Sequence, residues 1–472
     1  MRTYLAAFIV SFAIVAAITP LIIALAMKMG WVDRGNRRSI HQRPIPRVGG
    51  LGILLGTLAP ITALLLYRND ISDFFFDGPA NSLVILLGGF LISLLGFIDD
   101  IHPLRARYKL FAQILLATGV WYMGFAITKI GTPFGVLDFG VFSWFVTVLW
   151  IVGIINAFNL IDGMDGLSSG IAFFVAGTVM VLAISNRLPI TALVSASLAG
   201  AVVGFLLYNF NPAKVFMGDC GSMFIGYILA VLSLKGASKS HTIVGLLVPL
   251  MAMGLPLLDA SLAILRRILR KQPIMSPDRQ HIHHILLSRG LTQKKTVLLM
   301  YGISMLLTVL ALGTLLLKDS QVFLAVAVFS IIIFVVITKL GYMEILFERY
   351  RIQKDKPIQQ SLEAFLLERI ADTKLETLKK AFAGLPVKGF AVLDGDGSEV
   401  YAEGEKDNIQ YIDMLTGKER VVRFYWEKAV PALSSRESTL FSLIAKAITL
   451  QACPEMKPED LSGLIVIERE KR

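Results

Sequence analysis

Acidic residues in this sequence gather at the ends of long apolar runs. Asp99 and Asp100 close one run, Asp162 and Asp165 follow another, and Asp219 precedes a third. A carboxylate at the centre of a membrane helix costs about 2.5 to 3.5 kcal/mol on insertion scales, so each acid needs a reason. Capping or ending a helix would explain any one of them. The whole set calls for a shared chemical role.

The residue types favour a site for a hard divalent cation and phosphate. Several carboxylates, together with asparagine carbonyls from short glycine-containing loops, suit Mg²⁺ or Mn²⁺. A cation that bridges a pyrophosphate offsets the charge on a leaving phosphate. The loop Arg279–His284 adds Arg and His donors for the remaining oxygens. Zinc is the competing interpretation, but His283 and His284 are adjacent and no Cys or Glu lies at zinc-site spacing.

Apolar helices must position these residues, because 55% of the 472 residues are hydrophobic and only 17% are charged. Windows of about 20 residues predict an all-α polytopic membrane protein with about eleven transmembrane helices in residues 1–340. The predicted spans begin near Tyr4, Val48, Ser82, Leu110, Val141, Leu167, Thr191, Gly221, Thr242, Val297 and Val322. The first runs to Met27 with only Arg2 ahead of it, so we expect an anchor that is retained rather than a cleaved signal peptide.

Lys and Arg set the predicted orientation. They are frequent after the first, third and ninth predicted spans and sparse in the loops between. By the positive-inside rule the rich loops are cytoplasmic, which places the N-terminus outside and the C-terminus inside. Most of the acids and the histidine loop then share the cytoplasmic face, whereas Asp259 lies within the ninth span. This asymmetry and anionic lipid head groups explain the net charge of +11, so the charge does not indicate nucleic acid.

After Leu340 the composition becomes that of a soluble protein. Residues 341–472 combine charged helical stretches with short strand-like runs, and they predict a cytoplasmic α/β accessory domain of about 130 residues. The expected strands are Gly389–Leu393, Arg420–Trp426 and Gly463–Glu468, and the expected helices are Ser361–Phe382 and Ser434–Leu450. Cys220 and Cys453 lie far apart in the sequence, so we expect no disulfide.

Five ordered motifs resemble those of the polyprenyl-phosphate N-acetylhexosamine-1-phosphate transferases, glycosyltransferase family 4. They are Pro44–Gly50, the Asp99-Asp100 pair with Lys109, Asn156–Gly166, Asn209–Ser222 and Asp278–His284. The resemblance covers roughly the first 300 residues and implies a bacterial plasma-membrane enzyme, in which a polyprenyl phosphate attacks the β-phosphorus of a UDP-sugar and UMP leaves. It also implies Mg²⁺ as cofactor, with Mn²⁺ as a substitute, and a homodimer.

The resemblance also assigns roles to residues. Asp219 resembles the metal ligand, with Asn159 as its partner, and Asp99 and Asp100 resemble the catalytic pair. A lipid phosphate is already largely ionised at neutral pH, so we favour a positioning role for Asp100 and leave Asp99 open. Phe216 would stack on uracil, with plain packing as the alternative. The implied substrate-binding residues are Arg43, Lys109, Asn156, Asp162, Asp165, Phe216, Arg279, His281, His283 and His284.

The histidine loop favours one sugar. The pattern His281-Ile282-His283-His284 resembles the branch that uses UDP-N-acetylglucosamine and undecaprenyl phosphate, whereas three consecutive histidines mark the muramoyl-pentapeptide branch. Another UDP-N-acetylhexosamine and UDP-muramoyl-pentapeptide remain alternative substrates. The sequence leaves the downstream glycan open, whether O-antigen of lipopolysaccharide, teichoic acid or another cell-wall polysaccharide. An ion-coupled transporter is a remote alternative, because transport sites gather near the bilayer midplane in paired halves. Cys220 departs from the family, which usually has Ser there.

Overall fold

The computed structural model has two compact units, Met1–Met343 and Glu344–Arg472. The described residues of the first unit are 1–33, 44–66, 84–132, 135–239, 244–269, 272–273 and 281–317, with single positions at 321, 330 and 338. Those of the second unit are 387–393, 399–404, 410–416, 420–426 and 465–469.

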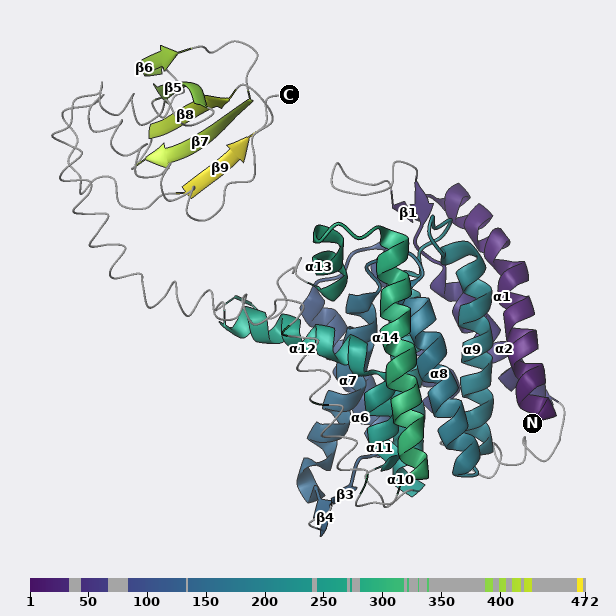
Figure 1. Ribbon diagram of the computed structural model, residues 1–472. Coiled ribbons are helices and arrows are strands. Elements are labelled where there is room, and N and C mark those ends of the chain that lie inside the picture. Colours follow the sequence, from purple (N-terminus) through teal and green to yellow (C-terminus); the bar gives the residue numbers. More distant parts are fainter. Residues whose placement is uncertain are drawn as a thin grey trace. The chain divides into compact units, whose positions relative to one another are not determined.

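The first unit is a bundle of helices (Figure 1). Its helices are α1 (Arg2–Met29), α2 (Gly50–Leu66), α5 (Gly89–Ile101, after a π-helical turn at Val84–Gly88), α6 (Ala106–Tyr122), α7 (Ser143–Ile161), α8 (Leu167–Ser185), α9 (Pro189–Asn209), α10 (Gly218–Lys239), α11 (Val244–Ala252), α12 (Gly254–Leu269), α13 (Ile282–Ser288) and α14 (Gln293–Gly313).

Within the described residues, seven helices are long and apolar enough to cross a membrane, or eight if α11 and α12 form one span bent by 74°. The chain is therefore a multi-pass membrane protein. Both α2 and α6 are shorter, at 17 residues each, and the predicted span near Val322 falls almost entirely outside the described residues. The number of eleven spans stays a prediction.

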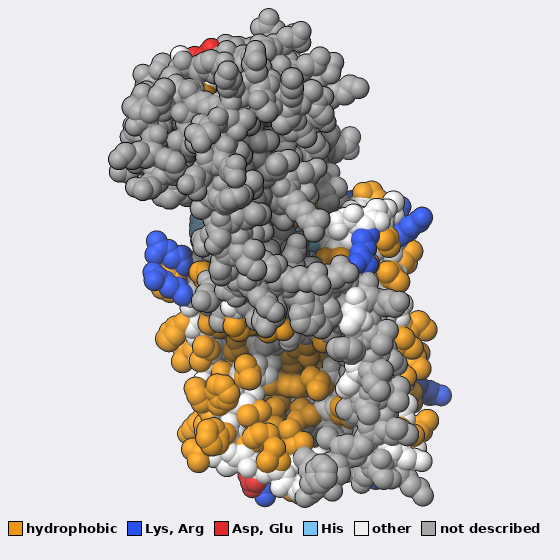
Figure 2. Space-filling model, turned by 60° about the vertical axis from the view of Figure 1, so that its left-hand side comes forward, with side chains coloured by type: hydrophobic (Ala, Val, Ile, Leu, Met, Phe, Trp, Pro, Cys, Tyr) orange, Lys and Arg blue, Asp and Glu red, His pale blue; other side chains and the backbone are white. Residues whose placement is uncertain are grey.

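Helix α10 lies at the centre of the bundle. It packs against α5 and α7, and 83% of its apolar window is buried inside the protein, against 17% for α1. On α1, Leu5, Leu21 and Leu25 are exposed. Hydrophobic side chains cover much of the visible flank of the helical unit, and Lys and Arg lie mostly near one end (Figure 2). These apolar flanks are the surfaces that face lipid.

Small residues bring the helices close together. A Cβ atom on Gly200 of α9 would overlap the carbonyl oxygen of Phe8 on α1, and one on Gly50 of α2 would overlap the backbone of Gly221 on α10. Association of membrane helices depends on such close packing, because burial against lipid-like side chains supplies little driving force. The backbone of α10 is fixed in this way from its first turn.

The two ends of the bundle differ. The strands β1 (Val32–Asp33) and β2 (Ile45–Pro46) pair beside α1, at the same end of the bundle as α13 (Figure 1). The hairpin of β3 (Lys129–Thr132) and β4 (Gly135–Asp138) lies at the opposite end with the N-terminus (Figure 1). The sequence analysis did not predict this hairpin. Its strands pair Lys129 with Asp138, whose charged groups lie 3.3 Å apart.

The described part of the second unit is a five-stranded antiparallel sheet. Its strands are β5 (Val387–Leu393), β6 (Glu399–Gly404), β7 (Gln410–Thr416), β8 (Arg420–Trp426) and β9 (Ile465–Arg469), in the order β6-β5-β8-β7-β9. Ala391 and Val392 are both buried although their side chains point to opposite faces, so both faces of the interior strand β5 are covered. The expected helices Ser361–Phe382 and Ser434–Leu450 lie outside the described residues.

Candidate active site

A cluster of charged residues forms where three central helices end or begin. Helix α5 ends at Ile101, just after Asp99 and Asp100, and α10 begins at Gly218, just before Asp219. Asn159 comes from the last turn of α7. Because α10 packs against both α5 and α7, these side chains meet although they lie up to 120 residues apart in the sequence.

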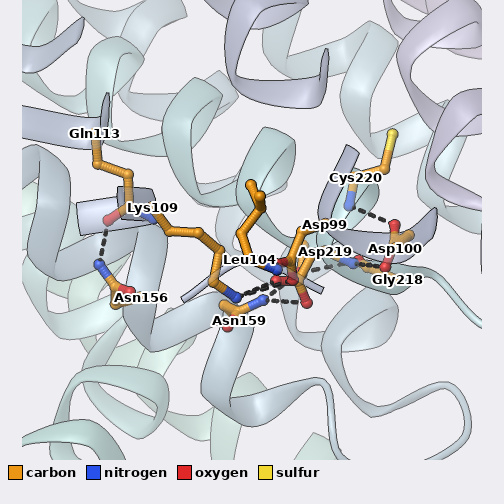
Figure 3. Close-up of polar contacts among 11 residues, drawn as sticks. Asp99, Asp100, Leu104, Lys109, Gln113, Asn156, Asn159, Gly218, Asp219 and Cys220 are labelled. Atoms are coloured by element: carbon orange, nitrogen blue, oxygen red, sulfur yellow. Dashed lines mark hydrogen bonds and ion pairs between the residues drawn. The ribbon is translucent and has the colours of Figure 1, made fainter. Parts of the chain in front are cut away.

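Lys109 links two carboxylates at the centre of the cluster. Its Nζ lies 3.0 Å from Asp99 Oδ2 and 2.9 Å from Asp219 Oδ2 (Figure 3). The other oxygen of Asp219 accepts a hydrogen bond of 2.9 Å from Asn159 Nδ2, which also lies 3.0 Å from Ser222 Oγ. One positive charge thus lies between two partly exposed carboxylates. The arrangement brings together Asp99, Lys109, Asn159 and Asp219, as the sequence analysis expected.

Asp100 is engaged differently from its neighbour. Its Oδ1 accepts a hydrogen bond of 2.8 Å from the backbone nitrogen of Asp219, and its Oδ2 accepts one of 3.0 Å from that of Cys220 (Figure 3). These are first-turn N–H groups of α10, which have no partner within the helix. A carboxylate at this position also interacts favourably with the helix dipole. Asp100 therefore fixes the start of α10, and with it the direction of Asp219.

Gly218 makes this contact possible. Its φ is +69°, a conformation that favours glycine, and a Cβ there would overlap the backbone oxygen of Arg47 and lie 2.5 Å from Asp100 Oδ2. The preceding residues pair with the Pro44–Gly50 motif: the nitrogen of Phe216 donates to Pro46, and Gly49 donates to the oxygen of Phe216. Two motifs that lie far apart in the sequence form one surface beside Asp219.

Asn156 ties α7 to α6. Its Nδ2 donates to Gln113 Oε1 at 2.7 Å, one turn after Lys109 on α6 (Figure 3). Gln113 is buried and was missed by the sequence analysis. The available signal was a polar residue at i+4 from Lys109 in an otherwise apolar helix, which puts both on one face. In the structure, Asn156 supports the helices that carry Lys109 and Asn159.

The loop between α7 and α8 carries Asp162 and Asp165. One oxygen of Asp165 accepts hydrogen bonds from Asn211 Nδ2 at 2.9 Å and from the nitrogen of Ala213 at 3.1 Å, so this carboxylate holds the loop in place. Burial raises the pKa of Asp162 well above its usual range, and the negative charges of Asp219, Asp100 and Asp165 raise this pKa further. Asp162 thus lies in the same field of negative charge as the Lys109 cluster.

The three histidines differ in exposure. His281 and His283 are buried, whereas His284 is exposed. The ring of His283 lies 4.3 Å from that of His284, and a Cβ on Gly163 would lie 2.8 Å from His283 Nε2. The residues His281–His284, called the histidine segment below, therefore contact the α7–α8 loop. Burial, together with the neighbouring His284, lowers the pKa of His283 to about 4. His283 is therefore neutral near pH 7.

The donor set fits a hard divalent cation with phosphate ligands. Among the residues that the structure describes, no group of three His, Cys, Asp or Glu side chains is arranged to enclose a metal ion by itself. Mg²⁺, however, is ordinarily held by one or two carboxylates together with water and substrate phosphates. Asp99 and Asp219 already approach a single cationic atom, Lys109 Nζ, within 3.0 Å. Arg43 and Arg279 lie outside the described residues.

Comparison with known proteins places the chain in a family. The sequence profile of glycosyl transferase family 4 matches residues 82–237, which include Asp99 through Asp219. A probable undecaprenyl-phosphate N-acetylglucosaminyl 1-phosphate transferase of Bacillus subtilis is 38% identical over 329 residues, which is 69% of this chain and 88% of the relative.

Two further relatives agree with this placement. A decaprenyl-phosphate N-acetylglucosaminephosphotransferase of Mycolicibacterium smegmatis is 35% identical, over 59% of this chain and 73% of the relative. An undecaprenyl-phosphate alpha-N-acetylglucosaminyl 1-phosphate transferase of Escherichia coli is 31% identical, over 58% of this chain and 74% of the relative. The chain therefore belongs to glycosyl transferase family 4, in the branch of these relatives.

Proposed function

We propose that the protein transfers N-acetylglucosamine 1-phosphate from UDP-N-acetylglucosamine to undecaprenyl phosphate and releases UMP. An oxygen of the lipid phosphate attacks the β-phosphorus, and the bond between that phosphorus and the oxygen bridging to the α-phosphate breaks. The product is a lipid diphosphate that carries the sugar. The observation that carries the proposal is the Asp99–Lys109–Asp219 cluster at the start of α10, in a chain 38% identical to a relative named for this reaction.

Each side chain of the cluster has a task that its contacts support. Lys109 offers ammonium hydrogens to phosphate oxygens and neutralises the two carboxylates beside it. Asp100 keeps the N-terminus of α10 in place and so orients Asp219. Proton abstraction is not required of Asp99 or Asp100, because a phosphate monoester is already largely ionised at neutral pH. Positioning and charge stabilisation are the main contributions of this protein.

Mg²⁺, or Mn²⁺ in its place, is proposed as the cofactor. Asp219 would hold it, with Asn159 beside it and Asp99 within reach of the same point. Asn159 supplies a carbonyl oxygen if its amide is turned, since amide orientation is assigned from hydrogen bonding. When bound, the cation offsets charge that develops on the phosphate oxygens.

The nucleotide is proposed to lie between the α7–α8 loop and the histidine segment. His284 is the exposed histidine there, and Asp162 belongs to the α7–α8 loop itself. Phe216, which pairs with Pro46 and Gly49, remains the proposed partner for uracil. We propose that this end of the bundle faces the cytoplasm, where UDP-sugars are found, because the positive-inside rule favours that side for the Lys- and Arg-rich loops. UDP-N-acetylglucosamine is favoured over other UDP-N-acetylhexosamines by the His281–His284 pattern and by the relatives' names.

The test is UMP release by the purified full chain with undecaprenyl phosphate, Mg²⁺ and a panel of UDP-sugars. The lipid product is identified by mass. UDP-N-acetylglucosamine should be used in preference to the others, and Asp219→Asn should reduce UMP release by at least a hundredfold. Asp138→Asn is the matched control, because it removes an exposed carboxylate on the β3–β4 hairpin. Failure of the wild type to release UMP from any of these sugars would contradict the proposal.

A further inference from the structure

A buried carboxylate–histidine pair, Asp259 and His281, lies outside the Lys109 cluster. Asp259, on α12, has a side chain that is only 1% exposed. Its Oδ2 lies 3.0 Å from His281 Nδ1, and its Oδ1 accepts a hydrogen bond of 2.9 Å from the backbone nitrogen of Ile282. Both oxygens are thus used, one by a side chain and one by the next peptide group.

These contacts fix the start of the histidine segment. His281 precedes α13, and its own side chain does not cap that helix. Asp259 instead holds the side chain of His281 and the first backbone N–H of α13 at the same time. A carboxylate beside Nδ1 keeps the proton on that nitrogen, so Nε2 is the ring nitrogen left to meet another group. Asp259 therefore determines both the position and the tautomer of His281.

The orientation of His281 extends to its neighbours. The ring of His283 is nearly parallel to that of His281, at 5° and a centroid distance of 5.8 Å, and His283 lies against Gly163. The exposed ring of His284 follows at 4.3 Å from His283. A change at His281 would thus displace the row of rings that borders the α7–α8 loop.

Burial of Asp259 in a membrane helix also requires a reason. A buried carboxylate loses its hydration, and only well-placed donors offset that loss. An apolar side chain would fill the same space without this cost. The two donors that meet Asp259 both belong to the histidine segment, so placement of that segment is the task that accounts for the carboxylate.

We infer that Asp259 is a positioning residue of the transfer reaction, acting through His281. This inference rests on the function proposed above. His281 and Ile282 meet different oxygens of Asp259, so asparagine at this position would turn its NH₂ group toward one of these two donors and lose that hydrogen bond. For histidines that bind a metal, loss of such a carboxylate partner costs about 10- to 100-fold in activity, and we expect an effect of similar size here.

The experiment is a double-mutant cycle on UMP release with Asp259→Asn, His281→Gln and the double variant. We expect Asp259→Asn to lower kcat/KM for UDP-N-acetylglucosamine about 10- to 100-fold and to leave KM for undecaprenyl phosphate unchanged. The double variant should be no slower than His281→Gln alone, since Asp259 acts through that ring. Asp138→Asn serves as the matched control. Wild-type kinetics in Asp259→Asn, or losses that multiply in the double variant, would overturn the inference.

A spectroscopic measurement tests the contact without turnover. The chain has six histidines, so ¹⁵N-histidine labelling in lipid gives a small set of signals, and His281→Gln assigns the one of interest. We expect a protonated Nδ1 on His281 in the wild type and a changed signal in Asp259→Asn. An unprotonated Nδ1 in the wild type refutes the inference even if Asp259→Asn fails to fold. If the wild type releases no UMP, the proposed function fails, and the spectrum still decides whether Asp259 sets the tautomer.

Discussion

Asp100→Asn should loosen the start of α10 without unfolding the bundle. Asp100 accepts hydrogen bonds from the backbone nitrogens of Asp219 and Cys220, at 2.8 and 3.0 Å. Asparagine keeps one acceptor oxygen and turns an NH₂ group toward the other N–H. The lost charge-assisted hydrogen bond and the weaker interaction with the helix dipole together amount to about 2 kcal/mol. That free energy corresponds to a roughly 30-fold increase in local opening.

Cys220 is the natural reporter of that opening. It is fully buried in the first turn of α10, and the chain's second cysteine, Cys453, can be replaced by Ser. In the Cys453→Ser background, Asp100→Asn should raise the alkylation rate of Cys220 about 30-fold when reclosing is faster than labelling. UMP release should fall as well, because Asp219 is displaced.

A second reporter separates local opening from general unfolding. Ala311→Cys, in a chain with both natural cysteines replaced by Ser, places a thiol at a fully buried position of α14. Its labelling rate should not respond to Asp100→Asn. An unchanged rate at Cys220 would refute the assignment of Asp100 as the residue that holds α10. Equal increases at both thiols would instead show that the whole bundle had lost stability.

Four further outcomes are expected. Chelation of divalent cations should abolish UMP release, and added Mg²⁺ or Mn²⁺ should restore it. Burial holds the pKa of His283 at about 4, so as the pH falls the unfolded protein binds a proton at this residue before the folded protein does. The free energy of unfolding of the wild type should therefore fall by about 2 kcal/mol between pH 7 and pH 5. The thermal midpoint of His283→Gln should fall less over the same pH range. Gly96→Ala should lower UMP release more than tenfold, because the added Cβ would overlap the backbone oxygen of Asp219. Gly119→Ala is its control and should match the wild type, because a Cβ there meets nothing within 4 Å. Truncation after Leu340 should leave UMP release largely intact in the same assay.

The sequence predicted that the acidic residues cluster, but it did not predict which partner each of them contacts. Charged residues avoid the apolar centre of a membrane, so their position at the ends of predicted spans could be read directly. Asp99 and Asp100, however, are adjacent on one helix and point about 100° apart. Which of them faces the start of α10 depends on how α5 packs, and no local pattern records that rotation. In the structure Asp99 accepts a hydrogen bond from Lys109, and Asp100 accepts one from the backbone of α10.

Other differences have similar causes. Hydropathy predicted one continuous ninth span from near Thr242, but the chain bends by 74° between α11 and α12. Pro256 cannot donate a hydrogen bond to the carbonyl of Ala252, so the helical ladder is interrupted there. The His281–His284 pattern predicted histidines that donate hydrogen bonds to the substrate, but it did not indicate which of them are exposed. Burial of His283 arises from its contact with Gly163, about 120 residues earlier in the chain, which spacing alone does not reveal.

Among the described residues, the site holds more carboxyl groups than cationic groups. Four carboxyl groups gather near the start of α10, those of Asp99, Asp100, Asp162 and Asp219, and burial favours the protonated form of Asp162. Lys109 is the ammonium group that lies between Asp99 and Asp219. Asp100 is neutralised in part by the N-terminus of α10, but Asp99 lies at the C-terminal end of α5, where the helix dipole opposes a negative charge. A nucleotide diphosphate would bring further negative charge to this place. The Mg²⁺ proposed above would meet both the carboxylates and the phosphates of a bound sugar nucleotide, which is the coordination that Mg²⁺ prefers.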